Sequence, residues 1–170
     1  MSTLHCPSCG TSFVRVVYSE GTAEKILARF HVFPFRCQLC TRRFRAFLTG
    51  SLDPTQSVDR RQYKRLPTSL HTEILAENAQ RSVHRVTEIS MGGCTIETSE
   101  SLPRGAYLEL MIAPASDKEA ITIETAMVCS ARQESMGIRF LELQPKDKQR
   151  LSHVVLSLLV GQSLHPSLTN

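Results

Sequence analysis

The sequence predicts a mainly β protein with two units: a small N-terminal unit held by a metal ion, and a larger antiparallel β unit that ends in one α-helix. Three observations lead to this fold class. Two Cys-x2-Cys pairs lie within the first 40 residues, apolar and polar side chains alternate in short runs over residues 70–143, and apolar residues at helical spacing follow residue 145. A chain of 170 residues has room for one ordinary domain or two small ones.

The composition excludes several classes of protein. Hydrophobic residues make up 41% of the chain, and 8 Gly plus 8 Pro are too few for a low-complexity sequence, so a folded core is expected. No window reaches the roughly 18–20 uninterrupted apolar residues of a membrane-spanning helix. The first residues lack the basic and apolar regions of a secretion signal. We therefore expect a cytoplasmic protein with no membrane partner, whose reduced cysteines can serve as metal ligands.

Charge and aromatic residues change at a boundary in the chain. Residues 1–58 hold seven Lys and Arg against three Asp and Glu, whereas residues 59–170 hold thirteen of each. Seven of the ten aromatic residues also lie in the first part. The polar, turn-forming stretch 49–57 separates the two parts. We predict a first domain over residues 1–48, a linker over 49–57 and a second domain over 58–165.

The first unit contains Cys6-Pro-Ser-Cys9 and Cys37-Gln-Leu-Cys40. Each pair fits one tight knuckle, and four thiolates complete a tetrahedral structural site with no open position for catalysis. Between the pairs, the runs Ser12–Tyr18 and Ile26–Phe35 predict two strands around a turn at residues 19–22. The unit resembles a zinc ribbon over about residues 4–47. Iron in a rubredoxin-like cage uses similar knuckles and stays an alternative to zinc.

Arginines and phenylalanines are interleaved on both sides of the second Cys pair. They are Arg36, Arg42, Arg43 and Arg45 with Phe35, Phe44 and Phe47. This mixture is typical of surfaces that contact phosphates and stack on bases. The alternative is that the phenylalanines fill the small core while the arginines form its solvated face. A role in docking another protein is equally compatible with the pattern.

The second unit has six short runs of alternating polarity separated by turn residues, which predict an antiparallel sandwich or barrel. The predicted strands are Leu70–Leu75, Val83–Ile89, Cys94–Glu97, Tyr107–Ile112, Ile121–Cys129 and Gly137–Leu143. A helix then begins near Pro145, carries an apolar stripe and is expected to end at Gly161. We expect this stripe to pack on the rim of the β unit.

Two motifs lie on this scaffold. The segment Asp59-Arg-Arg-Gln-Tyr-Lys-Arg65 places Arg61 and Arg65 four residues apart, and Arg60 adds a third guanidinium. Guanidinium groups bind phosphate oxygens and the O6/N7 edge of guanine through paired hydrogen bonds. The second motif, Glu88-Ile-Ser-Met-Gly-Gly93, supplies a small hydroxyl at Ser90 and then two glycines, which let a ligand approach the backbone.

In order and spacing, these motifs make residues 58–160 resemble the PilZ domain, a receptor module for cyclic di-GMP. The signatures of that family are R-x-x-x-R before a β-barrel and [D/N]-x-S-x-x-G further along a strand. Arg61 and Arg65 match the first signature, and Ser90 and Gly93 match the second. The run Met136–Phe140 is similar to a late strand of the family. The resemblance implies a six-stranded antiparallel β-barrel with a C-terminal helix.

The resemblance also implies a function, a cyclic di-GMP-binding effector or adaptor in bacterial second-messenger signalling. Arg61 and Arg65, helped by Arg60, would grip the phosphates and guanine edges, and Ser90 with the Gly93 backbone would line the barrel face. The cationic segment, which we expect to be mobile through self-repulsion, would become ordered around the dianion and reorient the zinc ribbon relative to the barrel.

Glu88 departs from the family pattern, which has Asp or Asn at that position. Its extra methylene displaces the carboxylate by about 1 Å or more, enough to disturb one hydrogen bond to guanine. The charge-assisted contacts of the arginines should still dominate the affinity.

Two other classes of function remain. In the first, the chain is a zinc-ribbon module that docks nucleic acid or a protein partner while its barrel no longer binds nucleotide. The second is an enzyme, which is not expected because the sequence shows no carboxylate pair, no nucleophile with its base and no open metal position.

Overall fold

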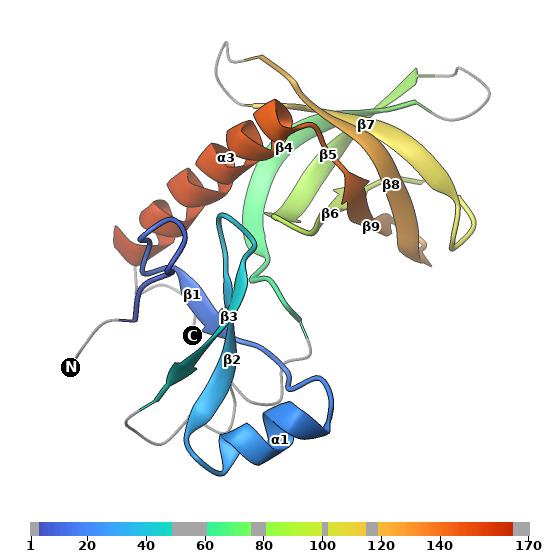
Figure 1. The fold of residues 1–170 in the computed structure, drawn as a ribbon. Coiled ribbons are helices and arrows are strands. Elements are labelled where there is room, and N and C mark those ends of the chain that lie inside the picture. Colours follow the sequence, from blue (N-terminus) through green and yellow to red (C-terminus); the bar gives the residue numbers. More distant parts are fainter. Residues whose placement is uncertain (1–3, 49–60, 76–80, 100–101, 115–118, 165–170) are drawn as a thin grey trace. The chain divides into compact units, whose positions relative to one another are not determined.

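The computed structural model describes residues 4–48, 61–75, 81–99, 102–114 and 119–164 (Figure 1). The chain divides into two compact units, Met1–Lys64 and Arg65–Asn170. The first unit contains β1 (Val14–Val16), α1 (Thr22–Ala28), β2 (Val32–Cys37) and β3 (Arg43–Phe47). The second contains β4 (Leu66–Leu75), β5 (Arg81–Ser90), β6 (Gly93–Glu97), β7 (Tyr107–Ala113), β8 (Ile121–Arg132), β9 (Ser135–Glu142) and α3 (Pro145–Leu164). The predicted mainly β class is confirmed.

The first unit is a three-stranded antiparallel sheet in the order β1-β2-β3. The central strand pairs Phe35 with Val16 on one side and with Phe44 on the other. The rings of Phe35 and Phe44 stack with their centroids 5.8 Å apart. Phe35 is buried, whereas Phe30 and Phe47 are 65% and 71% exposed. The alternative in which Phe35, Phe44 and Phe47 all fill the core is therefore wrong for Phe47.

Helix α1 corrects the predicted strand over Ile26–Phe35, because the strand begins only at Val32. The segment Thr-Ala-Glu-Lys-Ile-Leu-Ala consists mostly of good helix formers, which outweigh the apolar run that suggested a strand. The carboxylate of Glu24 accepts the Glu20 amide hydrogen at 2.7 Å, next to the start of the helix. His31, with φ of 57°, separates the helix from β2.

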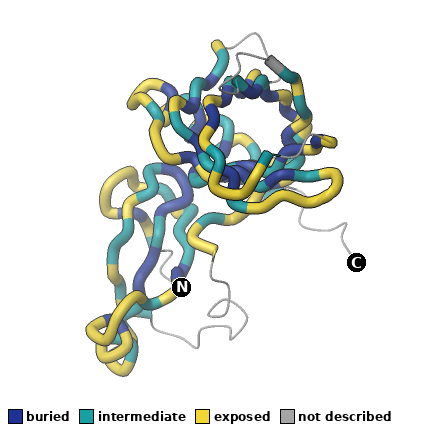
Figure 2. Tube along the Cα trace, turned by 90° about the vertical axis from the view of Figure 1, so that its right-hand side faces the viewer, coloured by how far each residue is buried: buried dark blue, intermediate teal, exposed yellow. Residues whose placement is uncertain are grey.

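The second unit is a closed antiparallel barrel of six strands, as predicted from the resemblance, and its strand order is β4-β5-β6-β9-β8-β7. It closes into a ring that is seen nearly end-on in Figure 2. Along β7 every second side chain is buried, and the fully buried Leu110, Ile112, Ile121 and Ile123 fill the interior. Register shifts in several strand pairs, for example between Val86 and Glu88, supply the local bends that a closed barrel needs.

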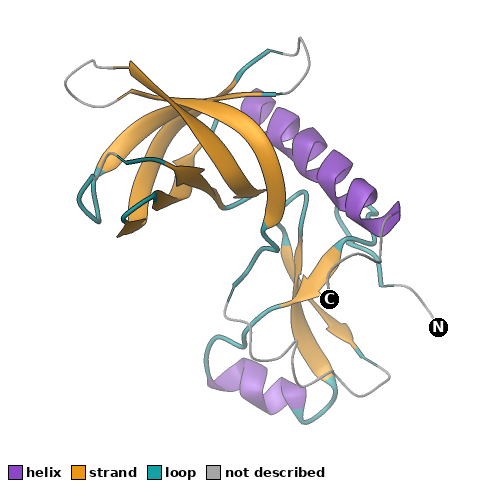
Figure 3. Cartoon of the chain, turned by 180° about the vertical axis from the view of Figure 1, so that it is seen from behind, coloured by secondary structure: helices purple, strands orange, loops and turns teal. Residues whose placement is uncertain are grey.

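Helix α3 packs against β4 and β8 (Figure 3). Its stripe of Leu151, Val155 and Leu159 is buried, which confirms the predicted amphipathic helix. The helix does not end at Gly161, as we expected, but continues to Leu164. A glycine inside a helix costs only about 1 kcal/mol relative to alanine and need not terminate it.

The first turn of α3 is attached to the barrel by a buried carboxylate. Asp147 is 2% exposed, and its Oδ1 accepts the Thr122 amide hydrogen of β8 at 3.3 Å. Arg150 also donates to this oxygen, at 3.2 Å. Among the described residues, no helix has both the length and the apolar character needed to cross a membrane.

Candidate functional sites

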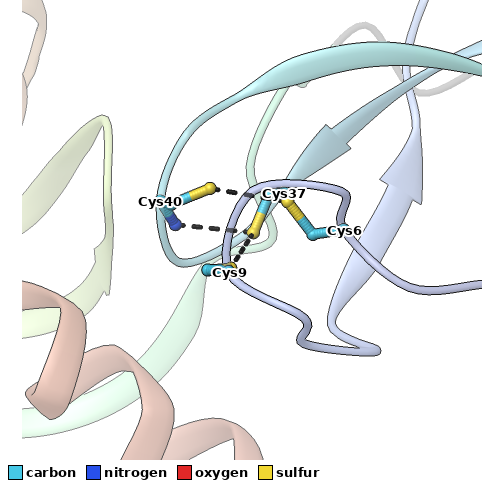
Figure 4. A group of neighbouring side chains, drawn as sticks. All are labelled: Cys6, Cys9, Cys37 and Cys40. Atoms are coloured by element: carbon cyan, nitrogen blue, oxygen red, sulfur yellow. Dashed lines mark hydrogen bonds between the residues drawn. The ribbon is translucent and has the colours of Figure 1, made fainter.

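The four cysteines of the two pairs come together in the first unit. Their Sγ atoms lie within 4.8 Å of one another, and they point toward a common centre in Figure 4. The Cys6–Cys40 and Cys9–Cys37 Sγ distances are both 3.6 Å. All are free thiols rather than disulfides. A tetrahedral zinc ion with Zn–S bonds of about 2.3 Å separates its sulfurs by about 3.8 Å, so the cluster has the dimensions of a metal site.

The two knuckles share a backbone feature. Gly10 follows the first pair with φ of 72°, and Thr41 follows the second with φ of 67°. In the second knuckle, the Leu39 and Cys40 amides both donate to Cys37 Sγ at 3.4 Å. A left-handed conformation is natural for glycine, but for a β-branched threonine it costs about 1–3 kcal/mol. Thr41 is thus a strained residue inside the knuckle.

The thiols differ in how readily they ionise. Burial raises the pKa of Cys37 to about 12, even though the Leu39 and Cys40 amides favour its thiolate. Burial likewise raises the pKa of Cys40. Burial also acts against the Cys6 thiolate, but hydrogen bonds from the backbone of Ser8 and Cys9 and from neighbouring thiols outweigh it and lower the pKa to about 7. Metal ligation requires the cysteines as thiolates, and a bound cation would offset the mutual repulsion of four such charges.

The donor set restricts which cation fits. Four sulfurs and no oxygen ligand suit a soft or borderline transition metal such as zinc or iron, and they do not suit Mg²⁺ or Ca²⁺. Because four cysteines fill a tetrahedral shell, they leave no position for a substrate or a reacting water. The chemistry that fits this cluster is structural.

A buried ion pair lies elsewhere in the first unit and was not predicted. Glu24 is 4% exposed. Its Oε2 lies 2.6 Å from Arg43 Nη2, and its Oε1 lies 3.4 Å from Arg45 Nη2. Burial alone would raise the pKa of Glu24, but the Glu20 amide and the two arginines outweigh it and hold that pKa below its usual value. Arg43 therefore ties β3 to α1 and does not belong to a solvated basic face.

In the barrel, Arg65 lies immediately before β4 and contacts two side chains of the β5–β6 hairpin. Its Nη1 is 3.3 Å from Glu88 Oε2 and 3.5 Å from Thr95 Oγ1. Thr95 also donates to Glu88 Oε2 at 3.2 Å. The Arg65 and Glu88 side chains are 45% and 43% exposed, so the three form a cluster open to solvent. Thr95 was not singled out from the sequence, although it is the register partner of Glu88.

Ser90 and Gly93 are register partners at the tip of the same hairpin. The Ser90 hydroxyl donates to the Gly93 carbonyl at 3.1 Å and accepts the Gly92 amide hydrogen at 3.3 Å. A Cβ atom on Gly93 would lie 2.1 Å from the Ile138 carbonyl oxygen of β9. The glycine is thus required by the neighbouring strand, and the space beside it is filled by protein backbone. Gly93 also pairs with Arg139, an exposed side chain that the sequence did not single out as a ligand residue.

The arginine segment is described from residue 61 onward, so Arg60 lies outside the described residues. Arg61 is exposed and belongs to the first unit, whereas Arg65 belongs to the second. The three residues between them bind to the second knuckle: Gln38 contacts the backbone of residues 62 and 64, and Arg36 contacts Tyr63. This arrangement differs from the mobile segment that charge repulsion suggested.

The comparison with known families decides the identity of the second unit. The family model of the PilZ domain matches residues 59–157, which is more than half of the chain. The chain belongs to the PilZ domain family. No curated protein sequence matches the chain significantly.

Solved PilZ proteins share the fold at low sequence identity. The PilZ domain of Escherichia coli YcgR with c-di-GMP matches at a TM-score of 0.53 and 16% identity, covering 65% of this chain and 100% of that one. The K. pneumoniae MrkH–c-di-GMP complex matches at 0.54 and 19%, covering 80% and 74%. The Bacillus subtilis inhibitor of motility MotI/DgrA matches at 0.52 and 18%, covering 77% and 74%.

Proposed function

We propose that the chain is a cytoplasmic cyclic di-GMP-binding effector or adaptor, with a receptor role and no catalytic one. The observation that carries the proposal is the Arg65–Glu88–Thr95 cluster beside the Ser90–Gly93 hairpin tip. Arg65, Glu88, Ser90 and Gly93 lie at positions of the two family signatures, and Thr95 lies two residues beyond the second. Structural relatives with the same fold, YcgR and MrkH, have been solved with c-di-GMP.

We expect the candidate residues to contact different parts of the ligand. Arg65 and Arg61, helped by Arg60, would bind the phosphates and guanine edges through charge-assisted hydrogen bonds. Ser90 and Gly93 would shape the hairpin tip that faces the other base. In the ligand-free protein Ser90 already has a donor and an acceptor partner, so its contribution would be to hold the tip rigid.

Glu88 would modulate the affinity of this site. Its ion pair with Arg65 is nearly half exposed on both sides, and such pairs contribute only about 0–1 kcal/mol. A dianionic ligand can displace the carboxylate from Arg65 at this small cost. We expect Glu88→Asn, which removes the competing charge, to tighten binding by a few-fold.

The division of the chain suggests how binding would be transmitted. The boundary between the two units falls between Lys64 and Arg65, inside the R-x-x-x-R motif. A ligand held by Arg61 and by Arg65 would constrain one unit relative to the other. The output we propose is this change in domain geometry, read by a protein partner through the first unit.

In this proposal the first unit is a zinc ribbon, with zinc held by Cys6, Cys9, Cys37 and Cys40. Zinc would supply folding free energy and no reactive centre. Elemental analysis of the purified protein should find one equivalent of zinc. One equivalent of iron, visible as charge-transfer absorption, would show that the site holds iron instead of zinc. A first unit that is folded without any metal would contradict the metal site itself.

Calorimetric titration with cyclic di-GMP tests the receptor function. We expect micromolar or tighter binding, at least tenfold weaker in Arg65→Ala and in Arg61→Ala. Arg85→Ala is the matched control, because Arg85 forms a similar exposed ion pair with Glu97, at 3.7 Å, on the same hairpin. Absence of binding heat at high protein concentration would contradict the proposal, as would an equal loss of affinity in the control.

A second function is favoured by one observation, the exposure of Phe30 and Phe47 in a unit rich in exposed cations. Among residues 4–48 and 61–64, the exposed Lys and Arg side chains of the first unit are Lys25, Arg29, Arg42, Arg45, Arg61 and Lys64. Aromatic faces among cations suit single-stranded nucleic acid. Fluorescence anisotropy with a labelled oligonucleotide should then show salt-dependent binding that weakens in Phe47→Ala. Binding that is absent at low salt would exclude this function.

A further inference from the structure

We propose that Gln38 of the second knuckle and Arg36, which precedes that knuckle in β2, are positioning residues for the nucleotide site. They hold the three residues between Arg61 and Arg65, so that metal binding and nucleotide binding are thermodynamically linked. This inference rests on the proposed receptor function and adds to it a reason why a metal knuckle precedes the barrel. All of the contacts that carry it lie within the first unit, Met1–Lys64.

Gln38 uses its whole amide group to hold the segment. The side chain is 6% exposed, and its Oε1 accepts the Lys64 amide hydrogen at 2.7 Å. Its Nε2 donates to the Gln62 carbonyl at 3.2 Å and to the Arg36 carbonyl at 3.3 Å. Binding an N–H and a C=O two residues apart is what a neighbouring β-strand does. A single buried side chain therefore fixes the backbone of residues 62–64, which bends at Gln62 and Tyr63.

Arg36 holds the residue between these two backbone contacts. Its Nη1 donates to the Tyr63 hydroxyl at 3.2 Å, and its guanidinium carbon lies 5.5 Å from the centre of the Tyr63 ring. The same Nη1 donates at 3.0 Å to the carbonyl of Thr41, the strained residue that closes the second knuckle. Tyr63 is thus connected through one guanidinium to the backbone of the knuckle.

These contacts depend on the metal because of where Gln38 stands in the chain. It lies between Cys37 and Leu39, inside the knuckle whose amides surround the Cys37 sulfur. Four clustered thiols need a cation to hold them together as thiolates. Loss of the metal would release the knuckle, and with it the amide that holds residues 62 and 64.

The direction of the linkage follows from preorganisation. A ligand that must order a loose segment loses affinity for each residue it immobilises, because fixing a backbone has an entropic cost. The knuckle orders three such residues in advance. Linkage is reciprocal, so a bound nucleotide should in turn slow metal release.

The test uses full-length, metal-loaded protein and three variants. Gln38→Ala removes the three hydrogen bonds of the Gln38 side chain, whereas Gln38→Glu keeps an acceptor for the Lys64 amide but loses the donors. Gln149→Ala is the matched control, because Gln149 is an exposed glutamine of α3. Metal content is measured first, and only variants with a full equivalent are compared, so that Gln38→Glu remains usable where Gln38→Ala loses the metal.

Two readouts are recorded on each protein, namely the dissociation constant for cyclic di-GMP and the rate of trypsin cleavage after Lys64. We expect Gln38→Ala to bind about tenfold more weakly, equivalent to about 1.4 kcal/mol, and to be cleaved about tenfold faster. Gln38→Glu should be intermediate, and Gln149→Ala unchanged. Trypsin reports the release of the segment independently of the nucleotide.

The outcomes separate this inference from the proposed function. If wild-type protein gives no binding heat, the receptor function fails and the linkage fails with it. If wild type binds and Gln38→Ala is cleaved faster but binds equally well, the linkage alone is overturned. Unchanged cleavage in Gln38→Ala would overturn the positioning role itself.

Discussion

The two units of this chain are stabilised by different interactions. Among the described residues, the second unit buries twenty-one apolar side chains, whereas the first buries six, of which Cys6 and Cys37 belong to the four-cysteine cluster. The charges differ too: residues 1–64 carry ten Lys and Arg against four Asp and Glu, and residues 65–170 carry ten against twelve. A barrel can fold on its core alone, whereas in a basic unit with so small a core the buried Glu24 ion pair and the metal that we propose would supply the missing stability.

Metal removal should have the largest effect, and it should be confined to the first unit. Apparent free energies of structural zinc binding in small metal-dependent folds are about 10–16 kcal/mol, more than a unit of this size can replace. We expect chelation, or Cys37→Ser, to unfold the first unit while the barrel keeps its own cooperative transition. Two-dimensional NMR spectra with and without chelator would show which resonances collapse. Collapse of the barrel resonances as well would contradict the contrast between the units.

A cavity in the barrel should show the opposite pattern. Ile123 is completely buried, and truncating such a side chain to alanine costs about 2–5 kcal/mol. We expect Ile123→Ala to lower the barrel's unfolding midpoint in urea without changing the metal content of the first unit. Ile26→Ala is a suitable control, since Ile26 is 58% exposed and its truncation should leave both properties unchanged.

The buried ion pair should make the first unit sensitive to acid. The pKa of Glu24 is lower in the folded unit than its ordinary value of 4.5, so the carboxylate stabilises the unit above that pH. This contribution is lost as the pH falls through the folded-state pKa, because the protonated group no longer pairs with Arg43. Glu24→Gln should destabilise the unit by about 2 kcal/mol at neutral pH.

The measurement for Glu24 is the difference in stability between wild type and Glu24→Gln, followed from pH 7 to pH 3. Metal loss in acid affects both proteins alike, so the difference isolates the ion pair. We expect this difference to shrink below pH 4.5. A difference that stays constant across the range would show that the charge of Glu24 contributes nothing.

Relief of strain at Thr41 should give the smallest effect. Glycine adopts the positive φ of this position without penalty, so Thr41→Gly should stabilise the first unit by about 1 kcal/mol, net of the glycine's greater freedom in the unfolded chain. Thermal unfolding of the metal-loaded protein would measure it. Thr11→Gly is the control, because Thr11 is not at a positive φ, and there we expect destabilisation. A destabilised Thr41→Gly would mean that the threonine side chain, rather than its backbone, is what the knuckle uses.

Sequence patterns predicted the barrel better than the first unit. Period-two alternation placed the six barrel strands because each strand has one buried face, and the paired cysteines predicted a cluster that the structure bears out. The same reasoning mistook residues 26–28 of α1 for part of a strand. A short apolar run does not show that Glu24, earlier in the same helix, is buried. Two of the phenylalanines are exposed for reasons that composition does not show.

For the candidate sites, the motifs gave the residue types but not their contacts. The pairing of Arg65 with Glu88 and Thr95 follows from strand register, which a sequence pattern does not specify. The Gln38 contacts join residues 24 and 26 positions apart through one side-chain amide, with no periodicity or charge to reveal them. The roles of Arg61, Arg65, Ser90 and Gly93 in binding stay predictions.

The central claim of the proposed function is that a nucleotide bound by Arg61 and Arg65 changes the domain geometry. Small-angle X-ray scattering of the metal-loaded chain, recorded during a cyclic di-GMP titration, tests it most directly. We expect the scattering curve to change and to saturate together with binding, and the change to disappear in Arg61→Ala. A curve that stays the same at saturating ligand would contradict the claim, because the barrel would then bind the nucleotide without the first unit.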